Sequence, residues 1–231
     1  MSFTSQRILY EDNHIIAVNK FTSDIVQSDK TGDEPLLEQV KQFIKKRDSK
    51  PGNVFLEVVH RIDRPVSGAI VFAKTSKGLS RMNRLFHDGK VKKIYWAIVG
   101  KLPEVQSETV AHYILRNPHQ NKSYAYKNEK PGTKLASLSY RLLGTTERYF
   151  FVEVDLHTGR HHQIRAQFAA LGMPIRGDLK YGYPRSNPNG GINLHSRLVS
   201  FEHPVTGEFI RIVAPPPEET LWFELLKIVE S

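Results

Sequence analysis

The chain has 231 residues, of which 39% are hydrophobic and 25% charged, as is ordinary for a globular protein with a substantial core. It has no cysteine, which excludes disulfides, thiolate metal sites and a cysteine nucleophile. No apolar run approaches the roughly 18 residues that span a bilayer, and the N-terminus lacks the pattern of a secretory signal, so we expect a cytoplasmic protein without membrane contact.

The formal net charge is +9 at pH 7, which favours a polyanionic partner over an inert basic surface. The charge is uneven. Between residues 74 and 101, eight Lys or Arg stand against one acid, Asp88, whereas the stretch from Pro216 to the end is acidic. Such a patch suits phosphate binding, because each neutralised phosphate releases counterions.

The first third of the chain predicts short strands and two helices. Residues 8–10 and 14–18 are typical of two strands around a turn at 11–13. Apolar residues at helical spacing predict a helix over 35–46, followed by a loop at 48–53. Residues 54–59 and 68–73 are strand candidates. A helix is expected from Ser76, its predicted cap, to Gly89.

Further strands are predicted over 94–99, 135–142 and 149–156, a short helix over 162–171, a loop over 180–192 and a final helix over 217–229. Strands and helices are interspersed without regular alternation. This favours an α+β fold with a mixed, largely antiparallel sheet over a doubly wound fold. We expect one domain over residues 1–231.

The run His60-Arg61-Ile62-Asp63-Arg64 is the first candidate for chemistry. It follows a predicted strand and precedes a turn at Pro65 and Gly68. Arginines on both sides would keep the Asp63 carboxylate ionised and oriented, ready to act as nucleophile or base. A turn with a capping Asp and solvated arginines explains the same residues equally well.

The second candidate is the run from Leu156 to Arg165, which contains Arg160, His161 and His162. It opens a predicted helix, whose N-terminal amides favour an anion. A metal site is disfavoured, because HExxH spacing is absent and His161 and His162 should point in different directions on a helix. A cluster that contacts phosphate or base fits better; the alternative is a solvated, basic helix start.

The third candidate is Tyr95 in the strand 94–99. Alternation places Tyr95, Ala97 and Val99 on one face of the strand and Ile94, Trp96 and Ile98 on the other. Tyr95 could stack on a base or exchange a proton, or simply pack in a core. The sequence contains no P-loop, no GxGxxG after a strand and no GxSxG motif.

Five runs together resemble the RluA-type family of pseudouridine synthases. They are His60 to Lys74 (the family's HRLDxxTSGLLxxAK), Lys93 to Gly100 (KxYxAxVxG, with Gly100 here directly after Val99), Leu156 to Arg165 (LxTGRxHQxR), Gly177 to Gly182 (GDxxYG) and Leu194 to Pro204 (LHxxxLxFxHP). The chain departs where it has Lys20-Phe21-Thr22-Ser23 in place of Lys-Pro-x-Gly, and Ile62 and Val66 in place of Leu and Thr. It is similar to minimal members that lack an S4 domain.

The resemblance implies a pseudouridine synthase fold and an isomerase that converts uridine in tRNA or rRNA to pseudouridine. It implies no cofactor and no metal, and we expect a monomer. Asp63, Tyr95 and Arg165 would be the catalytic residues, with Arg165 paired to Asp63. The implied RNA-binding residues are His60, Arg61, Arg64, Lys74, Lys93, Arg160 and His162. A non-catalytic RNA-binding protein on the same fold and a metal-dependent nuclease that uses the His cluster are the alternatives.

Overall fold

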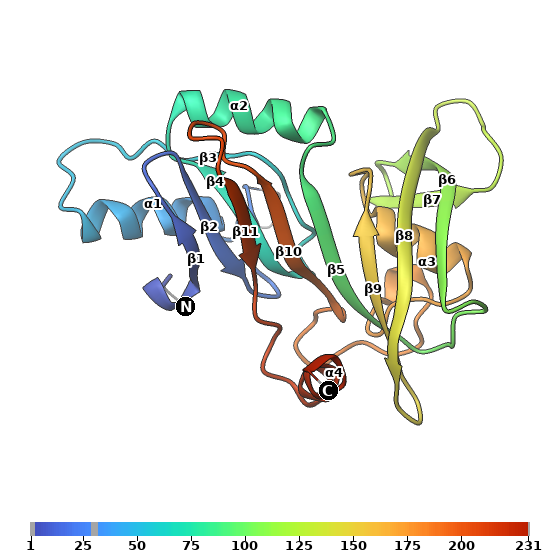
Figure 1. Cartoon of the computed structure of the whole chain (residues 1–231). Coiled ribbons are helices and arrows are strands. Elements are labelled where there is room, and N and C mark those ends of the chain that lie inside the picture. Colours follow the sequence, from blue (N-terminus) through green and yellow to red (C-terminus); the bar gives the residue numbers. More distant parts are fainter. Residues whose placement is uncertain (1–2, 29–31, 231) are drawn as a thin grey trace. The chain divides into compact units, whose positions relative to one another are not determined.

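The computed structural model describes residues 3–28 and 32–230, and it divides the chain into two compact units (Figure 1). Unit 1 comprises Met1–Lys92 and Ser196–Pro216, and unit 2 comprises Lys93–His195 and Pro217–Ser231. The expectation of a single domain remains a prediction.

Unit 1 is built on strands in the order β1-β2-β4-β10, with β3 paired to β4 and β11 paired to β10. The strands are β1 (Ile8–Glu11), β2 (Ile15–Lys20), β3 (Glu57–Val58), β4 (Ser67–Ala73), β10 (Leu194–Glu202) and β11 (Phe209–Val213). A 3-10 turn (Ser5–Arg7) precedes β1. The pairs β1–β2, β2–β4, β3–β4 and β10–β11 are antiparallel. The strand expected over 54–59 is thus reduced to two residues.

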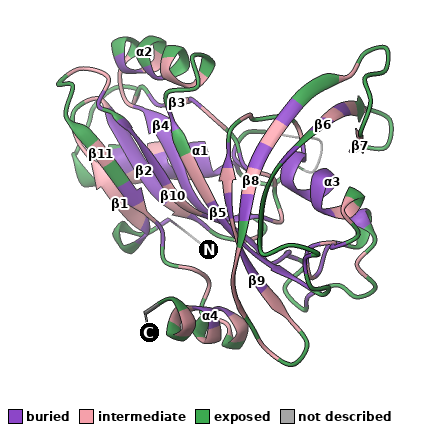
Figure 2. Ribbon diagram, turned by 45° about the vertical axis from the view of Figure 1, so that its right-hand side comes forward, coloured by how far each residue is buried: buried purple, intermediate pink, exposed green. Residues whose placement is uncertain are grey.

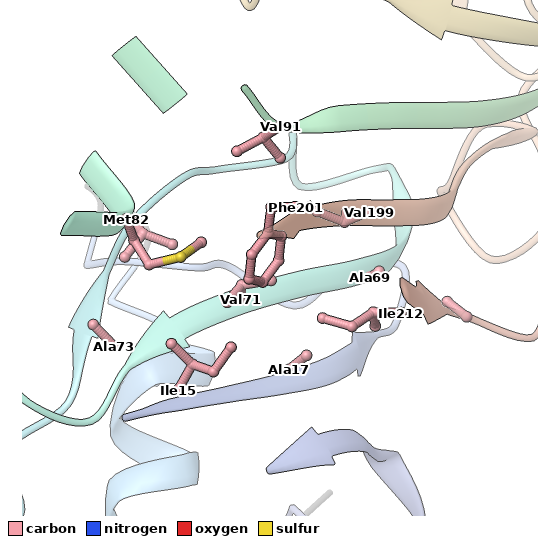
Figure 3. Close-up of a cluster of buried hydrophobic side chains, with 12 residues drawn as sticks. Ile15, Ala17, Ala69, Val71, Ala73, Met82, Val91, Val199, Phe201 and Ile212 are labelled. Carbon is pink, nitrogen blue, oxygen red and sulfur yellow. The ribbon is translucent and has the colours of Figure 1, made fainter. Parts of the chain in front are cut away.

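Two helices cover opposite faces of the unit 1 sheet because β2 and β4 alternate their side chains. Helix α1 (Leu36–Arg47) packs on the face that includes Ile16 and Phe72, whereas α2 (Ser76–His87) packs on the face that includes Ile15 and Val71. Figure 3 shows the α2 side of this core, where Met82 lies among strand residues. β4 is buried along its whole length, and Figure 2 shows it enclosed in this way.

The start of α2 differs from the sequence prediction. Thr75, not Ser76, is the N-cap, and its hydroxyl accepts a hydrogen bond from Gly78 N–H at 3.0 Å. The predicted end is confirmed: Gly89 has a φ of 69°, and Lys90 N–H bonds to the Leu85 carbonyl at 2.9 Å.

Unit 2 has strands in the order β5-β9-β8-β6-β7, all antiparallel. They are β5 (Lys92–Val99), β6 (Ser107–Asn117), β7 (Lys122–Tyr126), β8 (Lys134–Thr145) and β9 (Phe150–Leu156), joined by α3 (Gln163–Ala170), a 3-10 turn (Leu179–Tyr181) and α4 (Thr220–Glu230). The sequence did not predict β6, β7, β10 or β11. The α+β class with a largely antiparallel sheet is confirmed.

The two faces of the unit 2 sheet carry different helices. Trp96, Ile98 and Phe151 form a core with Trp222 and Leu225 of α4. On the other face, α3 places Phe168 edge-on to Tyr140 of β8, with ring centroids 6.0 Å apart. Within the described ranges, no helix is long and apolar enough to cross a membrane.

Candidate active site

A buried lysine anchors the segment of unit 1 that carries Asp63. Lys20, at the end of β2, is fully buried, and its Nζ donates to the carbonyls of Phe21 (3.0 Å), Arg64 (2.9 Å) and Val66 (2.7 Å). The turn is closed by Val66 N–H, which donates to the Asp63 carbonyl at 3.0 Å. The backbone directly after Asp63 is therefore held from two directions.

Burial of the Lys20 charge costs free energy. Burial lowers the pKa of Lys20 to about 7, while the negative charges of Asp24 and Asp63 act in the opposite direction. The Asp63 carboxylate is half-buried. Lys20 thus contributes a positive field and a backbone clamp to the same short segment.

The loop that departs from the family pattern, residues 20–23, keeps the backbone that a glycine would take. Ser23 has a φ of 78°, in the left-handed region, and its N–H donates to the Arg64 carbonyl at 3.2 Å. Phe21, at the usual proline position, places its ring 4.2 Å from the guanidinium carbon of Arg7, which is buried and ion-paired with Asp24. The loop thus holds the Asp63 segment through the bond from Ser23 N–H to the Arg64 carbonyl, although its sequence differs from the family pattern.

His60 supports the same segment. Its Nε2 accepts a hydrogen bond from Val71 N–H at 3.0 Å, so that nitrogen carries no proton. Its ring stacks on Phe86 of α2, with centroids 4.8 Å apart. His60 therefore links the Asp63 segment to β4 and α2, and its RNA contact remains a prediction.

The three basic candidates of unit 1 differ in their surroundings. Arg61 is exposed. Arg64 is also exposed and pairs with Asp33 at 2.6 Å. Lys74 is tied down, because its Nζ lies 2.6 Å from both Glu11 Oε1 and the Asp12 carbonyl. Their RNA-binding roles remain predictions.

In unit 2, a network of hydrogen bonds connects the start of α3 to the sheet. Gln163 Oε1 accepts from Thr158 Oγ1 (2.7 Å) and Arg160 N–H (3.0 Å), and its Nε2 donates to the Ser137 carbonyl at 3.0 Å. Ser137 N–H in turn donates to Thr158 Oγ1 at 3.0 Å. The Thr and Gln of the TGRxHQ run thus fix the start of the helix that presents Arg165.

Arg165 is held by a carboxylate from the GDxxYG run. Its Nε and Nη2 donate to Asp178 Oδ2 (2.7 Å) and Oδ1 (2.9 Å), and both residues are buried. Such a bidentate pair fixes the plane of the guanidinium as well as its position. Tyr181 adds its ring, with the Arg165 guanidinium carbon 5.0 Å from the centroid.

Tyr181 also organises the histidine cluster. Its hydroxyl accepts from Ser123 N–H at 2.8 Å and lies 3.0 Å from His162 Nδ1. Burial, followed by the charges of Arg165 and His161, lowers the pKa of His162 to about 2, so this ring is neutral at physiological pH. His162 contributes no charge to RNA binding; a contact of another kind remains a prediction.

The expectation that the two histidines point apart was wrong. The rings of His161 and His162 stack, with centroids 3.8 Å apart, because His162 precedes α3 in a left-handed conformation with a φ of 53°. Among the described residues, no three His, Cys, Asp or Glu side chains gather into a possible metal site.

Tyr95 faces the α3 side of the sheet. It pairs with Val154 of β9, which pairs with Tyr140 of β8, and directly paired residues point to the same side. Because Tyr140 contacts Phe168 of α3, the buried Tyr95 lies on the face covered by the helix that carries Arg165. The predicted alternation of this strand is confirmed.

The remaining two basic candidates of unit 2 are Lys93 and Arg160. Lys93 is half-buried, burial lowers its pKa, and a Cβ added to Gly159 would lie 4.0 Å from its Nζ. Arg160 is exposed and donates from Nε to the Leu135 carbonyl at 3.1 Å. Sequence reasoning assigned no role to Lys20, Asp178 or Tyr181. The GDxxYG run was the signal that could have identified the last two.

A solved structure titled Human RNA Pseudouridylate Synthase Domain Containing 4 aligns with a TM-score of 0.79 at 22% identity, over 98% of this chain and 94% of that one, which shows the shared fold. A family model described as RNA pseudouridylate synthase matches residues 14–170. The chain belongs to this family.

Curated relatives cover most of this chain. An uncharacterized RNA pseudouridine synthase of Synechocystis is 33% identical over 218 residues, which are 91% of this chain and 65% of that protein. Ribosomal large subunit pseudouridine synthase C of Buchnera aphidicola from Schizaphis graminum is also 33% identical, over 90% of this chain and 66% of that protein. The chain thus spans about two thirds of the length of these relatives.

Proposed function

We propose that this chain converts uridine in RNA to pseudouridine, with Asp63 as the catalytic carboxylate and without a cofactor. The observation that carries the proposal is the construction of the Asp63 segment, in which a buried ammonium and the Ser23 amide hold the backbone that follows the carboxylate. A carboxylate held in this way is positioned before substrate binds, which reduces the entropic part of a reaction barrier. Family membership supports the same activity.

In the proposed reaction, the N1–C1′ bond of the uridine breaks, the uracil rotates, and C5 bonds to C1′. C5 loses its proton and N1 gains one, so atoms and charge balance. Asp63 acts on the sugar or the base, Arg165 provides the counter-charge of Asp63, and Tyr95 stacks on the uracil and assists the proton transfer. The target nucleotide has to leave its stack, at a cost of about a few kcal/mol, and Arg61 fills the vacated position.

The RNA that we propose first is rRNA of the large ribosomal subunit, because the Buchnera relative is named for that target. tRNA is the second substrate to test. We also propose that the protein acts as a monomer in the cytoplasm. The net charge of +9 supports an RNA partner.

The test is tritium release. The protein is incubated with rRNA or tRNA that carries tritium at uridine C5, without added metal or nucleotide, and released tritium is counted. We expect release from one of the two pools. Asp63→Asn should lower the rate at least about 100-fold, the usual minimum for loss of a catalytic acid or base, with little change in RNA affinity.

Asp33→Asn is the matched control, because Asp33 is a more exposed carboxylate of the same unit that pairs with Arg64. This variant should retain turnover. Release that persists in Asp63→Asn would refute the assignment of Asp63. Tight RNA binding by the wild-type protein without any release would identify a non-catalytic RNA-binding protein instead.

A further inference from the structure

In the basic stretch between residues 74 and 101, some side chains are bonded or partly buried within the protein, and others are exposed to solvent. Lys74 bonds to Glu11 and Asp12, and Lys93 is half-buried. By contrast, four of the exposed side chains of α2 and of the residues just after it are basic. We define the α2 basic face as Lys77, Arg81, Arg84 and Lys90, all of which are exposed.

Three members of this face form a stripe along one side of the helix. Residues 77, 81 and 84 are spaced four and three apart, so they lie on one face of an α-helix. Lys77 and Arg84 are about 10 Å apart along the axis, at 1.5 Å per residue. That length matches about three nucleotides of a duplex strand, at 3.4 Å each. Arg81 is fixed within the stripe, because its Nη1 donates to the Pro204 carbonyl at 2.8 Å.

One neighbouring acid offsets part of these charges: the pKa of Asp88 is lowered by its hydrogen bond to His87 and also by the charges of Lys90 and Arg84. Asp88 is the single carboxylate among residues 76–92, and it lies 3.0 Å from His87 Nδ1. Helix α1 is different: Lys41 pairs with Glu38, and Arg47 pairs with Glu11 and Asp48. Both helices belong to unit 1; α1 keeps two exposed lysines, Lys45 and Lys46, whereas α2 and the residues just after it present four exposed basic side chains.

The position of Lys77 is unfavourable for the helix itself. It stands in the first turn of α2, where no acid is present, and a cation there is repelled by the positive end of the helix dipole. A residue that weakens its own helix without a structural benefit is typical of a functional position. Phosphate is the group that both the lysine and the helix end attract.

The α2 basic face is also rigidly connected to the Asp63 segment. His60, three residues before Asp63, stacks on Phe86 of α2 at 4.8 Å. Met82 and the apolar side of α2 pack on β4, which follows the same segment. RNA bound along α2 would thus be held in a constant relation to Asp63.

We propose that the α2 basic face binds the phosphate backbone of the RNA substrate, as a contact that positions the RNA and does not read its sequence. This inference rests on the proposed function for the identity of the ligand. It narrows the basic stretch that the sequence linked to phosphate binding to four residues, Lys77, Arg81, Arg84 and Lys90.

The test compares two double variants of the full chain. Lys77→Gln/Arg84→Gln removes two charges from α2, and Lys45→Gln/Lys46→Gln removes two exposed charges from α1, on the opposite face of the same sheet. Binding of a fluorescein-labelled oligouridylate of about 20 nucleotides is measured by anisotropy across a salt series; each phosphate contact contributes about 0.7 to the slope of log K against log salt.

The α2 variant should lower that slope by about 1.4 and weaken binding on the order of 10-fold at 0.1 M salt, whereas the α1 variant should change neither beyond the general effect of two charges. Equal slopes in both variants would overturn the proposal and leave α2 as a solvated surface. If the double variant folds poorly, Lys77→Gln alone should give half the slope change without a lower Tm, because the lost charge opposes the helix dipole.

The binding result is independent of catalysis. A reduced slope in the α2 variant together with no tritium release from the wild-type protein would support the surface and refute the proposed reaction. Normal release by the wild-type protein, with unchanged RNA binding in the α2 variant, would support the reaction and refute the surface.

Discussion

Asp178 is a residue of unit 2 whose replacement should strongly lower stability. It accepts two hydrogen bonds from Arg165, and only 5% of Arg165 and 1% of Asp178 is exposed. Asp178→Asn removes the carboxylate that accepts both of these hydrogen bonds and compensates the buried guanidinium from within unit 2. Removing one partner of a buried ion pair costs about 3–5 kcal/mol, and burial this complete leaves little solvent screening to reduce that value.

Intrinsic fluorescence measures this effect in the relevant unit. The two tryptophans of the chain, Trp96 and Trp222, are both buried in unit 2, so urea unfolding followed by tryptophan emission reports on that unit. We expect a lower urea midpoint at an unchanged slope, and a fall in Tm on the order of 10 °C. Glu147→Gln, an exposed acid of the same unit, should change stability by less than about 0.5 kcal/mol.

The double replacement Arg165→Met/Asp178→Leu separates loss of the pair from loss of packing. Apolar residues of similar size in place of a buried ion pair often restore stability, so this variant should recover most of the loss. An Asp178→Asn protein as stable as the wild type would refute the reasoning, because it would show that Asp178 does not compensate the buried charge of Arg165.

Two predictions concern unit 1. Because burial lowers the pKa of Lys20 from 10.5 to about 7, the unfolded chain binds this proton more tightly between these pH values, so wild-type stability should rise with pH across that window relative to Lys20→Met. A difference in urea unfolding that is constant from pH 7 to 10 would contradict this. Ser23→Gly should stabilise the protein by about 0.5–1 kcal/mol, because φ at residue 23 is 78°. The matched change Ser80→Gly, inside α2, should instead destabilise it by about 0.5 kcal/mol, and thermal unfolding of both variants decides.

Elements with a regular apolar period were predictable from the sequence. The helix expected over 35–46 is found at Leu36–Arg47, because Leu36, Val40 and Ile44 repeat every four residues and are all buried. A helix that buries one face has apolar residues at a regular spacing in its sequence.

Elements that bury polar side chains were missed. In β10 the polar residues His195, Ser196 and Ser200 are buried, so the sequence of this strand shows no alternation of apolar and polar residues. In β6, His112 points inward, while Tyr113 on the opposite side is only half-buried. Periodicity cannot identify a strand whose inward positions are satisfied by hydrogen bonds rather than by apolar contact.

The candidate site shows the same division. Motifs in the sequence suggested Asp63, Tyr95 and Arg165 as site residues, and these remain predictions. Lys20 was not suggested, because its partners are backbone carbonyls up to 46 residues away and a carbonyl has no sequence signature. Asp178 was visible as part of a motif, yet only the folded chain shows that its partner is Arg165.

Three buried cations connect these observations. Arg7 and Lys20 in unit 1 and Arg165 in unit 2 are at most 5% exposed, and burying a cation costs free energy that an apolar side chain at the same position would not. Each of them is connected to a residue proposed for catalysis: Lys20 holds the turn after Asp63, Arg7 holds the loop at 20–24, which bonds to the Arg64 carbonyl through Ser23 N–H, and Arg165 is itself one of the proposed residues. Because stability alone would favour apolar residues at these positions, their concentration there is better explained by the need to fix charged groups for chemistry.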